Sequence, residues 1–469
     1  GYNTEAAGDD EGRIDGGGVS LNITHETSLA DYTSITAFRS TRLEFELDQD
    51  QGAAPSPAVQ VGTIRSYYDA YSQEFRAGAK PESDIQWTVG LYYLNATTGY
   101  NPSEIFLDFT AFGAPATQRT FLYDEQVLNS YAVFGEASFE LMPDTNITAG
   151  IRYTKDDYDM DYEGKFFDAG KTTRFIDFRV VPPDPTEGEA FTQNSDFSKV
   201  TYRAIVDHRF NEDLMTYFSY SRGFRSGGYS LAFPFFNGAP TPVVNPEVLD
   251  SFEIGFKSNF MDGNLVINGA AFLYDYENVV IGFVETGGNR NVNAAAAEIK
   301  GFELDIIATP FDNGFKLVAG IGVIDGEYTD FPDGPIATPT LIGGNPIGGN
   351  TISTGNLTGN DTIRTPDLTL NITPSYTWDT EVGTFTAAVN YYHNSGFAWD
   401  VSNRLTEPSY DVLNASLSWT SLNEKLNLRL WGRNLTDKQY AIYSAVSELT
   451  DSYAPAAPLT WGVTGTFSF

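Results

Sequence analysis

The most regular feature of this sequence is an alternation of apolar and polar residues that recurs in short segments. In the segment YAVFGEASFEL, Tyr131, Val133 and Phe139 share one face of an extended strand. Glu136 and Glu140 fall on the opposite face, because successive side chains of a strand point to opposite sides. The pattern predicts β-strands with one apolar face and one wet face.

The segment LNLRLWGRN repeats this pattern near the end of the chain. Leu426, Leu428 and Leu430 alternate there with residues that include Arg429 and Arg433. Charges at alternate positions of a strand must face water, so such strands separate an apolar environment from an aqueous one.

We predict seventeen such strands, which follow one another along nearly the whole chain. They lie near residues 18–27, 31–40, 68–78, 85–94, 130–141, 145–154, 199–210, 214–223, 250–260, 264–275, 297–308, 314–327, 368–378, 384–394, 410–420, 425–435 and 461–469.

The connections between these strands are of two kinds, which alternate strictly. Short connections contain SLAD, KPES, LMPDT, FNED, FMDG, PFDNG, DTEVG and SLNE, whereas the long ones are rich in Gly, Asn, Thr and Pro. The longest runs from about Tyr328 to Asp367. Structureless loops of more than about 12–15 residues are uncommon in compact soluble domains. Tight turns that alternate with long loops instead predict an all-β fold, a transmembrane antiparallel β-barrel.

The composition agrees with a barrel and excludes other classes. Aromatic residues make up 14% of the chain although its mean hydropathy is negative, so apolar residues are interleaved with polar ones. No run approaches the roughly 18–20 apolar residues that a membrane-spanning helix needs. The chain has no cysteine, which removes disulfides and thiolate metal sites. The net charge of -34 argues against a nucleic-acid partner, because phosphate binding needs a basic surface.

The beginning of the chain and the number of strands predict a barrel that is incomplete on its N-terminal side. The opening GYNTEAAGDDEGRIDGGG lacks the pattern of a signal peptide, so we expect either a protein that is not exported or the later part of a longer chain. We predict that residues 1–17 are an irregular remnant and that residues 18–469 form the barrel domain. Bacterial barrels normally have an even number of strands, and five more would give the 22-stranded, plugged type. With seventeen strands, 18–27 and 461–469 should be left as unpaired edges.

Several stretches of the chain resemble the TonB-dependent receptors. They are NPEVLDSFEIGFKSNFMDGNLVINGAAFLYDY, AEIKGFELDIIATP, LNLRLWGRNLTDKQY and WGVTGTFSF in that order, preceded by LADYTSITAFRS and SQEFRAG. The resemblance extends from about Val19 to Phe469. It implies a plug domain and a TonB-binding box in front of the barrel, which this sequence does not contain, so coupling to the TonB complex would involve that region.

The last nine residues are also similar to the signal that the outer-membrane assembly machinery reads in such barrels. We predict that Trp461, Phe467 and Phe469 carry this signal and face lipid on the last strand.

The acidic segment DDYDMDYEG is the candidate metal site. Its carboxylates at alternate positions could supply oxygen ligands to calcium, or face solvent or lipopolysaccharide through divalent ions; they are Asp157, Asp159, Asp161 and Glu163. The three histidines, His25, His208 and His393, fall in different strands without metal spacing, so we expect no zinc or iron site. No catalytic motif is present, and we expect neither an enzyme nor a cofactor.

Two clusters of aromatic and arginine residues are candidate ligand contacts, and each follows a strand that runs outward. Such residues suit a planar anionic ligand through stacking and forked hydrogen bonds, although a membrane-boundary girdle would use them too. The first cluster contains Arg222, Arg225, Tyr229, Phe233, Phe235 and Phe236. The second contains Tyr391, Tyr392, His393, Trp399 and Arg404. The stretch LIGGNPIGGNTISTGNLTGND is either a mobile lid or a simple variable loop.

The sequence therefore predicts an outer-membrane receptor of a Gram-negative bacterium that imports a scarce, bulky ligand with energy from TonB. The family resemblance points most often to ferric siderophores, while vitamin B12, heme and oligosaccharides stay open. A passive porin and a barrel adhesin are the competing classes. The expected partners are outer-membrane lipid and lipopolysaccharide, the TonB complex, the assembly machinery and the small-molecule ligand.

Overall fold

The computed structural model describes residues 12–48, 59–108, 117–168, 189–229, 243–285, 288–311, 314–342, 345–446 and 451–469. Every regular element within these ranges is a β-strand. No helix in the described ranges is long and apolar enough to cross a membrane.

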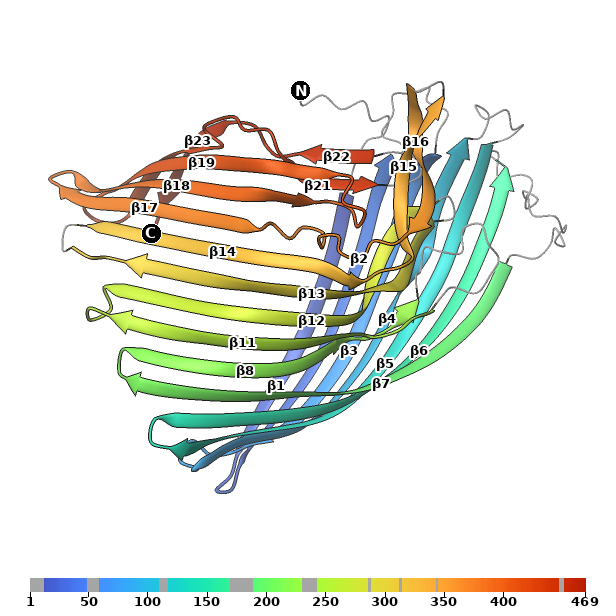
Figure 1. Cartoon of the computed structure of the whole chain (residues 1–469). Helices are drawn as coiled ribbons and strands as arrows, with labels where there is room; N and C mark the ends of the chain where they lie inside the picture. The colour runs from blue at the N-terminus through green and yellow to red at the C-terminus, as the bar shows by residue number, and fades with distance from the viewer. Residues whose placement is uncertain are drawn as a thin grey trace.

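In the described part of the chain, seventeen strands form one antiparallel sheet, which confirms the predicted number, and Figure 1 shows that this sheet is strongly curved. Each strand pairs with the next one along the sheet. The strands are β1 (Gly12–Glu26), β2 (Asp31–Asp48), β3 (Val59–Gly78), β4 (Ile85–Asp108), β5 (Thr117–Met142), β6 (Thr145–Asp168), β7 (Glu189–Asn211), β8 (Leu214–Arg225), β11 (Glu247–Phe260), β12 (Leu265–Glu285), β13 (Gly288–Ala308), β14 (Phe315–Asp330), β17 (Leu368–Thr380), β18 (Gly383–Ala398), β19 (Thr406–Thr420), β20 (Leu426–Arg433) and β23 (Thr460–Phe467).

Successive connections in this sheet alternate between two ends. At one, here called the turn end, they have two to six residues; at the opposite loop end most are longer, although β12 and β13 are joined there by only two residues. At the turn end, β5 and β6 are joined by only two residues, of which Asp144 has a positive φ of 64°. The β11–β12 turn likewise contains Met261, Asp262 and Gly263 with positive φ. Asp and Gly adopt this conformation more readily than most residues, which explains their frequency in the predicted turns.

Three further hairpins lie in the long connections. They are β9 (Gly228–Tyr229) with β10 (Val243–Val244), β15 (Gly334–Ile342) with β16 (Asn345–Gly355), and β21 (Ala441–Val446) with β22 (Asp451–Pro455). The glycine-rich stretch that we considered a lid or a variable loop therefore contributes to a paired β-hairpin, β15–β16, at the loop end (Figure 1).

The predicted strand ends are wrong at the loop end. β1 begins at Gly12, six residues before the predicted start, so part of the stretch expected to be irregular is strand. β4 continues to Asp108 and β6 to Asp168, fourteen residues beyond their predicted ends at 94 and 154. Backbone pairing continues there although the apolar face has ended, so a search for alternating apolar residues stops too early.

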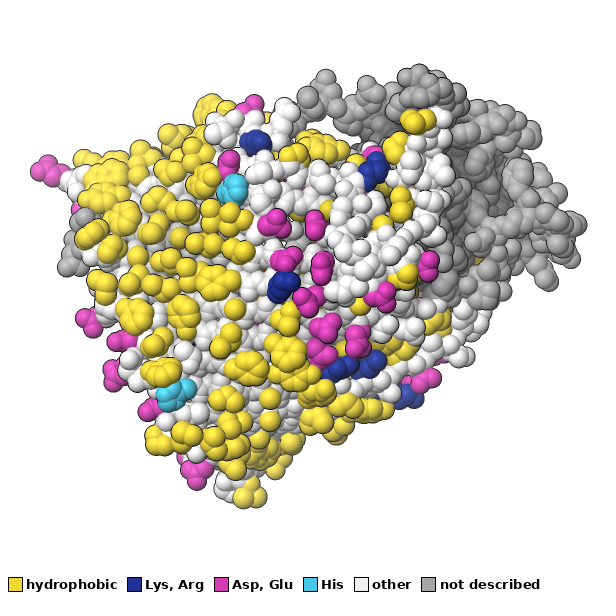
Figure 2. All heavy atoms as spheres, in the orientation of Figure 1, with side chains coloured by type: hydrophobic (Ala, Val, Ile, Leu, Met, Phe, Trp, Pro, Cys, Tyr) yellow, Lys and Arg dark blue, Asp and Glu magenta, His cyan; other side chains and the backbone are white. Residues whose placement is uncertain are grey.

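One face of the sheet, here called the outer face, carries an exposed apolar belt over its turn-end half. Directly paired residues of neighbouring strands share a face, so the face can be followed by register across all seventeen strands. The belt includes Val19, Phe38, Tyr71, Val133, Tyr153, Phe218, Phe252, Val323, Leu417, Leu430 and Val463. Figure 2 shows this apolar area on the visible side, with acidic and basic side chains along its loop-end border.

The C-terminal segment follows the predicted facing. Trp461 and Phe467 of β23 lie on the outer face, and both are exposed. Phe469 packs edge-on against Phe467 with ring centroids 5.4 Å apart. Leu428 and Leu430 also lie on the outer face, which confirms the alternation read from the sequence.

The opposite, inner face is polar in the same half of the sheet. Arg429 lies there and donates to Ser416 Oγ at 3.3 Å. Asparagine side chains link neighbouring strands: Asn390 Nδ2 donates to Asn371 Oδ1 at 2.7 Å, and Asn414 Nδ2 donates to Asn390 Oδ1 at 3.0 Å. A face lined by amides and arginines requires water or another polar surface against it.

The sheet has two edges in the described part of the chain, β1 and β23. Each pairs there with a single neighbour, β2 and β20 respectively. The expectation that these two strands would be left as unpaired edges is therefore confirmed for the described residues.

A buried apolar cluster lies at the loop end and supports the base of the β15–β16 hairpin. Phe331 is completely buried and Tyr328 is 2% exposed, with their rings 5.1 Å apart in an edge-on arrangement. Ile281, Ala297 and Leu357 join them. This cluster positions the loops that carry the candidate site.

Candidate functional site

The candidate site lies at the loop end, where β18 and β19 are joined by residues 399–405. Trp399, predicted as a ligand contact, is 9% exposed, and its Nε1 donates to Glu407 Oε2 at 3.3 Å. Glu407 is itself buried and also accepts from the backbone N–H of Ala441 at 3.2 Å. The indole is thereby fixed between the β18–β19 connection and β21.

Arg364 places a guanidinium beside this indole. Its Cζ lies 5.2 Å from the centroid of the Trp399 ring and 5.9 Å from that of Tyr443. Arg364 has a positive φ of 58°, and its backbone N–H donates to the Ala398 carbonyl at 2.9 Å. Within the described part of the chain, no carboxylate forms an ion pair with Arg364. Among the described residues, Arg364 instead lies beside two aromatic faces, which attract a cation weakly.

Arg404, the predicted arginine of the same cluster, is neutralised by Asp451. Its Nη1 and Nη2 contact the two oxygens of the Asp451 carboxylate at 2.8 and 2.7 Å. Asn350 Nδ2 donates to the same carboxylate at 2.9 Å. The hydrogen bonds from Arg404 hold the pKa of Asp451 below its ordinary value. One carboxylate therefore joins the β18–β19 connection to both the β15–β16 and the β21–β22 hairpins.

Tyr391 and Tyr392, predicted together, lie on opposite faces of β18. Tyr391 is on the outer face, where its hydroxyl donates to Asp411 Oδ1 at 2.7 Å, and His393 contacts the same oxygen at 2.8 Å. Tyr392 lies on the inner face, with its ring 6.0 Å from that of Tyr410. Of this pair, only Tyr392 lies on the inner face of the sheet.

The two arginines of the first cluster also separate onto opposite faces. Arg222 lies on the outer face, 2.8 Å from Asp250 and 3.8 Å from Glu277. Arg225 lies on the inner face and contacts Glu247 at 2.7 Å. Both charges are already paired, which reduces what they can offer a ligand.

Tyr229 folds inward against the strands. It is 7% exposed, and its backbone N–H donates to Gln126 Oε1 at 3.3 Å. Its hydroxyl is buried and has no hydrogen-bond partner among the described residues. Phe233, Phe235 and Phe236, predicted with it, lie outside the described residues.

The predicted calcium site is not formed. The side chains lie in a row on the outer face of β6, and alternate residues of a strand are roughly 7 Å apart, too far to converge on one ion. Asp157 pairs with Lys155 at 3.0 Å, and Asp161 accepts from Thr192 at 2.6 Å. Among the described residues, no group of three or more His, Cys, Asp or Glu side chains is placed to hold a metal ion. This applies to the four predicted ligands as well, which are Asp157, Asp159, Asp161 and Glu163.

The predicted residues that the structure brings to one place are Trp399 and Arg404, and Arg364 joins them as a residue that sequence reasoning missed. Arg364 stands in NDTIRTPDL, within the longest connection, and no periodic pattern marks it. A guanidinium held between two aromatic rings can accept a planar anionic group by stacking and by forked hydrogen bonds.

The chain belongs to the family of TonB-dependent receptor-like β-barrels, whose model matches residues 1–435. A probable TonB-dependent siderophore receptor of Acinetobacter baumannii, PiuA, is 23% identical over 254 residues. That match covers 53% of this chain and 31% of PiuA.

Solved structures of such receptors share the fold. FyuA of Yersinia pestis, a ferric yersiniabactin uptake receptor, superimposes with a TM-score of 0.77 at 16% identity, covering 99% of this chain and 63% of FyuA. PiuA of A. baumannii superimposes with a TM-score of 0.70 at 15% identity, and the match covers 98% of this chain and 65% of PiuA. The ferric-catecholate import receptor Fiu of E. coli K12 superimposes with a TM-score of 0.67 at 14% identity, and the match covers 100% of this chain and 66% of Fiu. The chain thus spans less than two thirds of the length of each of these receptors.

Proposed function

We propose that this chain forms the barrel of an outer-membrane receptor that imports a scarce, bulky, anionic ligand with energy from TonB, and that the ligand is a ferric siderophore. The family membership supports TonB-coupled uptake across the outer membrane of a Gram-negative bacterium. The relatives PiuA, FyuA and Fiu are named as receptors for siderophores or their ferric complexes. The exposed apolar belt on the outer face supports a position in lipid.

The observation that supports an anionic ligand is the guanidinium of Arg364, which lies beside the rings of Trp399 and Tyr443 and has no ion pair among the residues that the structure describes. Ferric catecholates and ferric carboxylates present negative charge on flat, aromatic or chelate surfaces. Such a surface can stack on an indole and simultaneously accept hydrogen bonds from a guanidinium. A neutral oligosaccharide would use the aromatic rings but not the charge.

The ligand is proposed to enter through the loop end. The β15–β16 and β21–β22 hairpins stand around the Arg364 site there, and Asp451 links both to Arg404. The turn end carries short connections that serve geometry. Capture would therefore take place among the loop-end hairpins and the upper inner face, above the apolar belt.

The test measures binding of ferric tris-catecholate, ferric hydroxamate, cobalamin and a neutral oligosaccharide to the receptor in detergent. We expect Arg364→Gln to weaken binding of the anionic ferric complex by about 5–30-fold, the loss of one charge-assisted hydrogen bond. Arg433→Gln is the matched control, because Arg433, the last residue of β20, also lies over an aromatic ring, with its Cζ 5.2 Å from the centroid of Trp431 and not of Trp399 or Tyr443. Equal affinities of wild type and Arg364→Gln for every ferric complex would refute the anionic site.

Energy coupling is tested separately in cells. Uptake of the bound ferric complex should stop when the proton-motive force is collapsed, while surface binding persists. Continued uptake without the proton-motive force would point to a passive pore.

A further inference from the structure

A cavity of about 570 Å³, here called the bulge cavity, opens in the loop-end half of β3 to β7. The function proposed above does not use it, because the Arg364 site lies beside β18 and β19. Four tyrosines line the bulge cavity, and none of its described lining residues is a lysine or an arginine. Four carboxylates line it as well, those of Asp124, Glu125, Asp161 and Glu163.

A β-bulge between β4 and β5 opens the sheet at this place. Asn101 and Pro102 of β4 stand together opposite the single residue Tyr123 of β5. Proline has no backbone N–H to give to the ladder, and a bulge commonly changes the direction of nearby side chains. Neighbouring residues of a regular strand point to opposite faces, but here Asp124 and Glu125 line the same cavity.

Asp124 forms the floor of the bulge cavity. It is 4% exposed, and its Oδ1 accepts from the backbone N–H of Tyr100 at 2.7 Å. The other carboxylate oxygen, Oδ2, is buried and has no hydrogen-bond partner among the residues that the structure describes. A buried polar atom without a partner is costly, so this oxygen calls for a hydrogen-bond donor from outside the chain.

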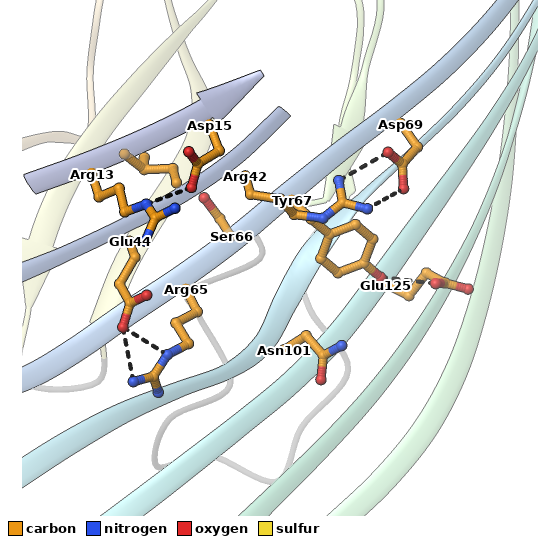
Figure 3. A pocket seen from close by; sticks show the side chains of 11 residues that line it. Arg13, Asp15, Arg42, Glu44, Arg65, Ser66, Tyr67, Asp69, Asn101 and Glu125 are labelled. Atoms are coloured by element: carbon orange, nitrogen blue, oxygen red, sulfur yellow. Dashed lines mark hydrogen bonds and ion pairs between the residues drawn. The ribbon is translucent and has the colours of Figure 1, made fainter. Parts of the chain in front are cut away.

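The hydroxyl of Tyr67 lies near the same carboxylate. It donates to Glu125 Oε2 at 2.8 Å, as Figure 3 shows. Burial raises the pKa of this hydroxyl, and the hydrogen bond to Glu125 and the charges of Glu125 and Asp124 raise it further. Asp124 and Glu125 therefore act on one small volume.

The positive charges nearest to this volume are already neutralised. Figure 3 shows the adjoining cavity, whose lining shares Tyr67, Asn101 and Glu125 with the bulge cavity. Each arginine of that neighbour contacts a carboxylate: Arg13 contacts Asp15, Arg42 contacts Asp69, and Arg65 contacts Glu44. The bulge cavity consequently keeps an excess of negative charge.

The rim of the bulge cavity places two carboxylates directly opposite each other. Glu125 of β5 and Asp161 of β6 are register partners, and both residues are exposed. Like charges in this position are destabilising. Thr192 Oγ1 donates to Asp161 Oδ1 at 2.6 Å, and the Tyr67 hydroxyl donates to Glu125, but neither donor carries a charge. A cation between the two strands would remove the repulsion.

The arrangement suits an organic cation better than a metal ion. A metal ion needs several ligands that converge on one point, and the described residues contain no group of three or more carboxylates placed in that way. Carboxylates at two depths, the floor and the rim, suit a ligand with two separated positive charges. An alkylammonium group donates hydrogen bonds to carboxylates, and its alkyl chain packs on tyrosine rings, whose faces attract cations.

From this geometry we propose that the bulge cavity binds a linear diamine, with one ammonium group on Asp124 and the other between Glu125 and Asp161. The first ammonium supplies the donor that Asp124 Oδ2 lacks, and the second offsets the repulsion at the rim. Because the ligand contacts both β5 and β6, binding should also hold the loop ends of these strands together. The bulge cavity shares no residue with the Arg364 site, so loss of diamine binding leaves the proposed ferric-ligand site intact.

The experiment measures binding of cadaverine to the full-length receptor in detergent by isothermal titration calorimetry. We expect Asp124→Asn/Asp161→Asn to weaken binding by at least about tenfold, because a charge-assisted hydrogen bond is lost at each end. Asp157→Asn/Asp196→Asn is the matched control, since it removes two facing carboxylates of β6 and β7 outside the cavity. Equal weakening by the two variants would reveal diffuse attraction to an acidic surface and would overturn the proposal.

Two further ligands test the chemical class. Pentylamine has the chain of cadaverine with a single ammonium group, so it should bind at least about tenfold more weakly. Equal affinities of the two amines would contradict the contact at both floor and rim. Displacement of cadaverine by an equal concentration of Mg²⁺ would assign the cavity to a metal ion instead.

The pH dependence gives a readout that the single variant Asp124→Asn provides even if the double variant does not fold. Burial raises the pKa of Asp124 to about 7, and the groups that face its carboxylate are Tyr100, Tyr162, Tyr67 and Glu125. Alkylammonium groups have a pKa near 10 and stay charged at pH 8. Cadaverine should therefore bind wild type up to about tenfold more tightly at pH 8 than at pH 6, and Asp124→Asn should lose this difference. The same pH dependence in wild type and variant would remove Asp124 from the site and refute the proposal.

Discussion

The two halves of β6 have the same backbone pairing but opposite distributions of apolar side chains. In the turn-end half, Ile151 and Tyr153 are exposed on the outer face, while Arg152 and Thr154 point inward. In the loop-end half the outer face turns acidic, and the inner face becomes apolar and buried. The reversal begins at Lys155, without any break in register.

The reversal reflects a change of surroundings along one continuous strand. Near the turn end, lipid is the apolar medium, so apolar side chains face outward. Near the loop end, water lies outside and other protein segments lie inside. Met160 is fully buried and Tyr158 is 8% exposed, with the Tyr158 ring 6.0 Å from that of Phe197 on β7. The loop-end half of the strand is therefore organised like a soluble protein.

This difference explains what the sequence could and could not predict. The seventeen strands, their turns and the outward facing of Leu428 and Val133 were predicted, because lipid enforces a strict alternation. The loop-end extensions were missed, although DYDMDYEG alternates as regularly, because its apolar residues sit on the other face. The sequence left open whether its carboxylates bind calcium or face solvent, and the structure shows Asp159 and Asp161 on the water-facing side of an ordinary strand pair.

The candidate site shows the same limit. Trp399 and Arg404 could be singled out by residue type, but their partners Glu407 and Asp451 depend on long-range pairing. Arg364 gave no signal, because its role comes from a positive φ and from two rings distant in sequence. The face on which a strand residue lies could be predicted only inside the belt. Outside it, Tyr391 and Tyr392 were assigned to one cluster, although adjacent residues of a strand point to opposite faces.

The strongest test of the turn-end half is a charge on its lipid face. We expect Leu428→Arg to lower the free energy of unfolding in bilayers by roughly 2–4 kcal/mol, because the side chain faces hydrocarbon. Arg429→Leu, on the inner face, should cost far less. Urea unfolding of the receptor folded into lipid vesicles measures both. Similar losses for the two variants would mean that the faces have been assigned wrongly.

A buried carboxyl provides a test of the soluble-like character of the loop-end half. Asp124 of β5 is 4% exposed above the belt, and its Oδ1 accepts from the backbone N–H of Tyr100 at 2.7 Å. Burial raises the pKa of Asp124 from its ordinary value of 3.8 to about 7. The folded state therefore binds a proton that the opened state releases, and local stability falls as the pH rises between these two values.

We accordingly expect the loop ends of β4 and β5 to open more easily at pH 8 than at pH 5.5, by roughly 1–3 kcal/mol. Amide hydrogen exchange around Tyr100, corrected for the intrinsic pH dependence, measures this difference. Asp124→Asn keeps the acceptor and removes the charge, so it should abolish the pH dependence. A pH dependence that persists in this variant would assign it to another group.

The smallest expected effect concerns the carboxylate that joins the loop hairpins. Arg404 and Asp451 are 24% and 34% exposed, so their forked pair is partly screened and should contribute about 1 kcal/mol. Because the pKa of Asp451 is lowered, this stabilisation is present at neutral pH and is lost as the pH falls below about 4. A double-mutant cycle of Arg404→Ala and Asp451→Ala, measured by hydrogen exchange in β21 and β22, isolates the contribution of the pair.

The same carboxylate should couple the two hairpins. If Asp451 joins them as the geometry indicates, Asp451→Ala should also raise hydrogen exchange in β16, since Asn350 loses its acceptor. Faster exchange confined to β21 and β22 would show that the hairpins move independently, and the loop end would then lack the cohesion that distinguishes it from an ordinary set of surface loops.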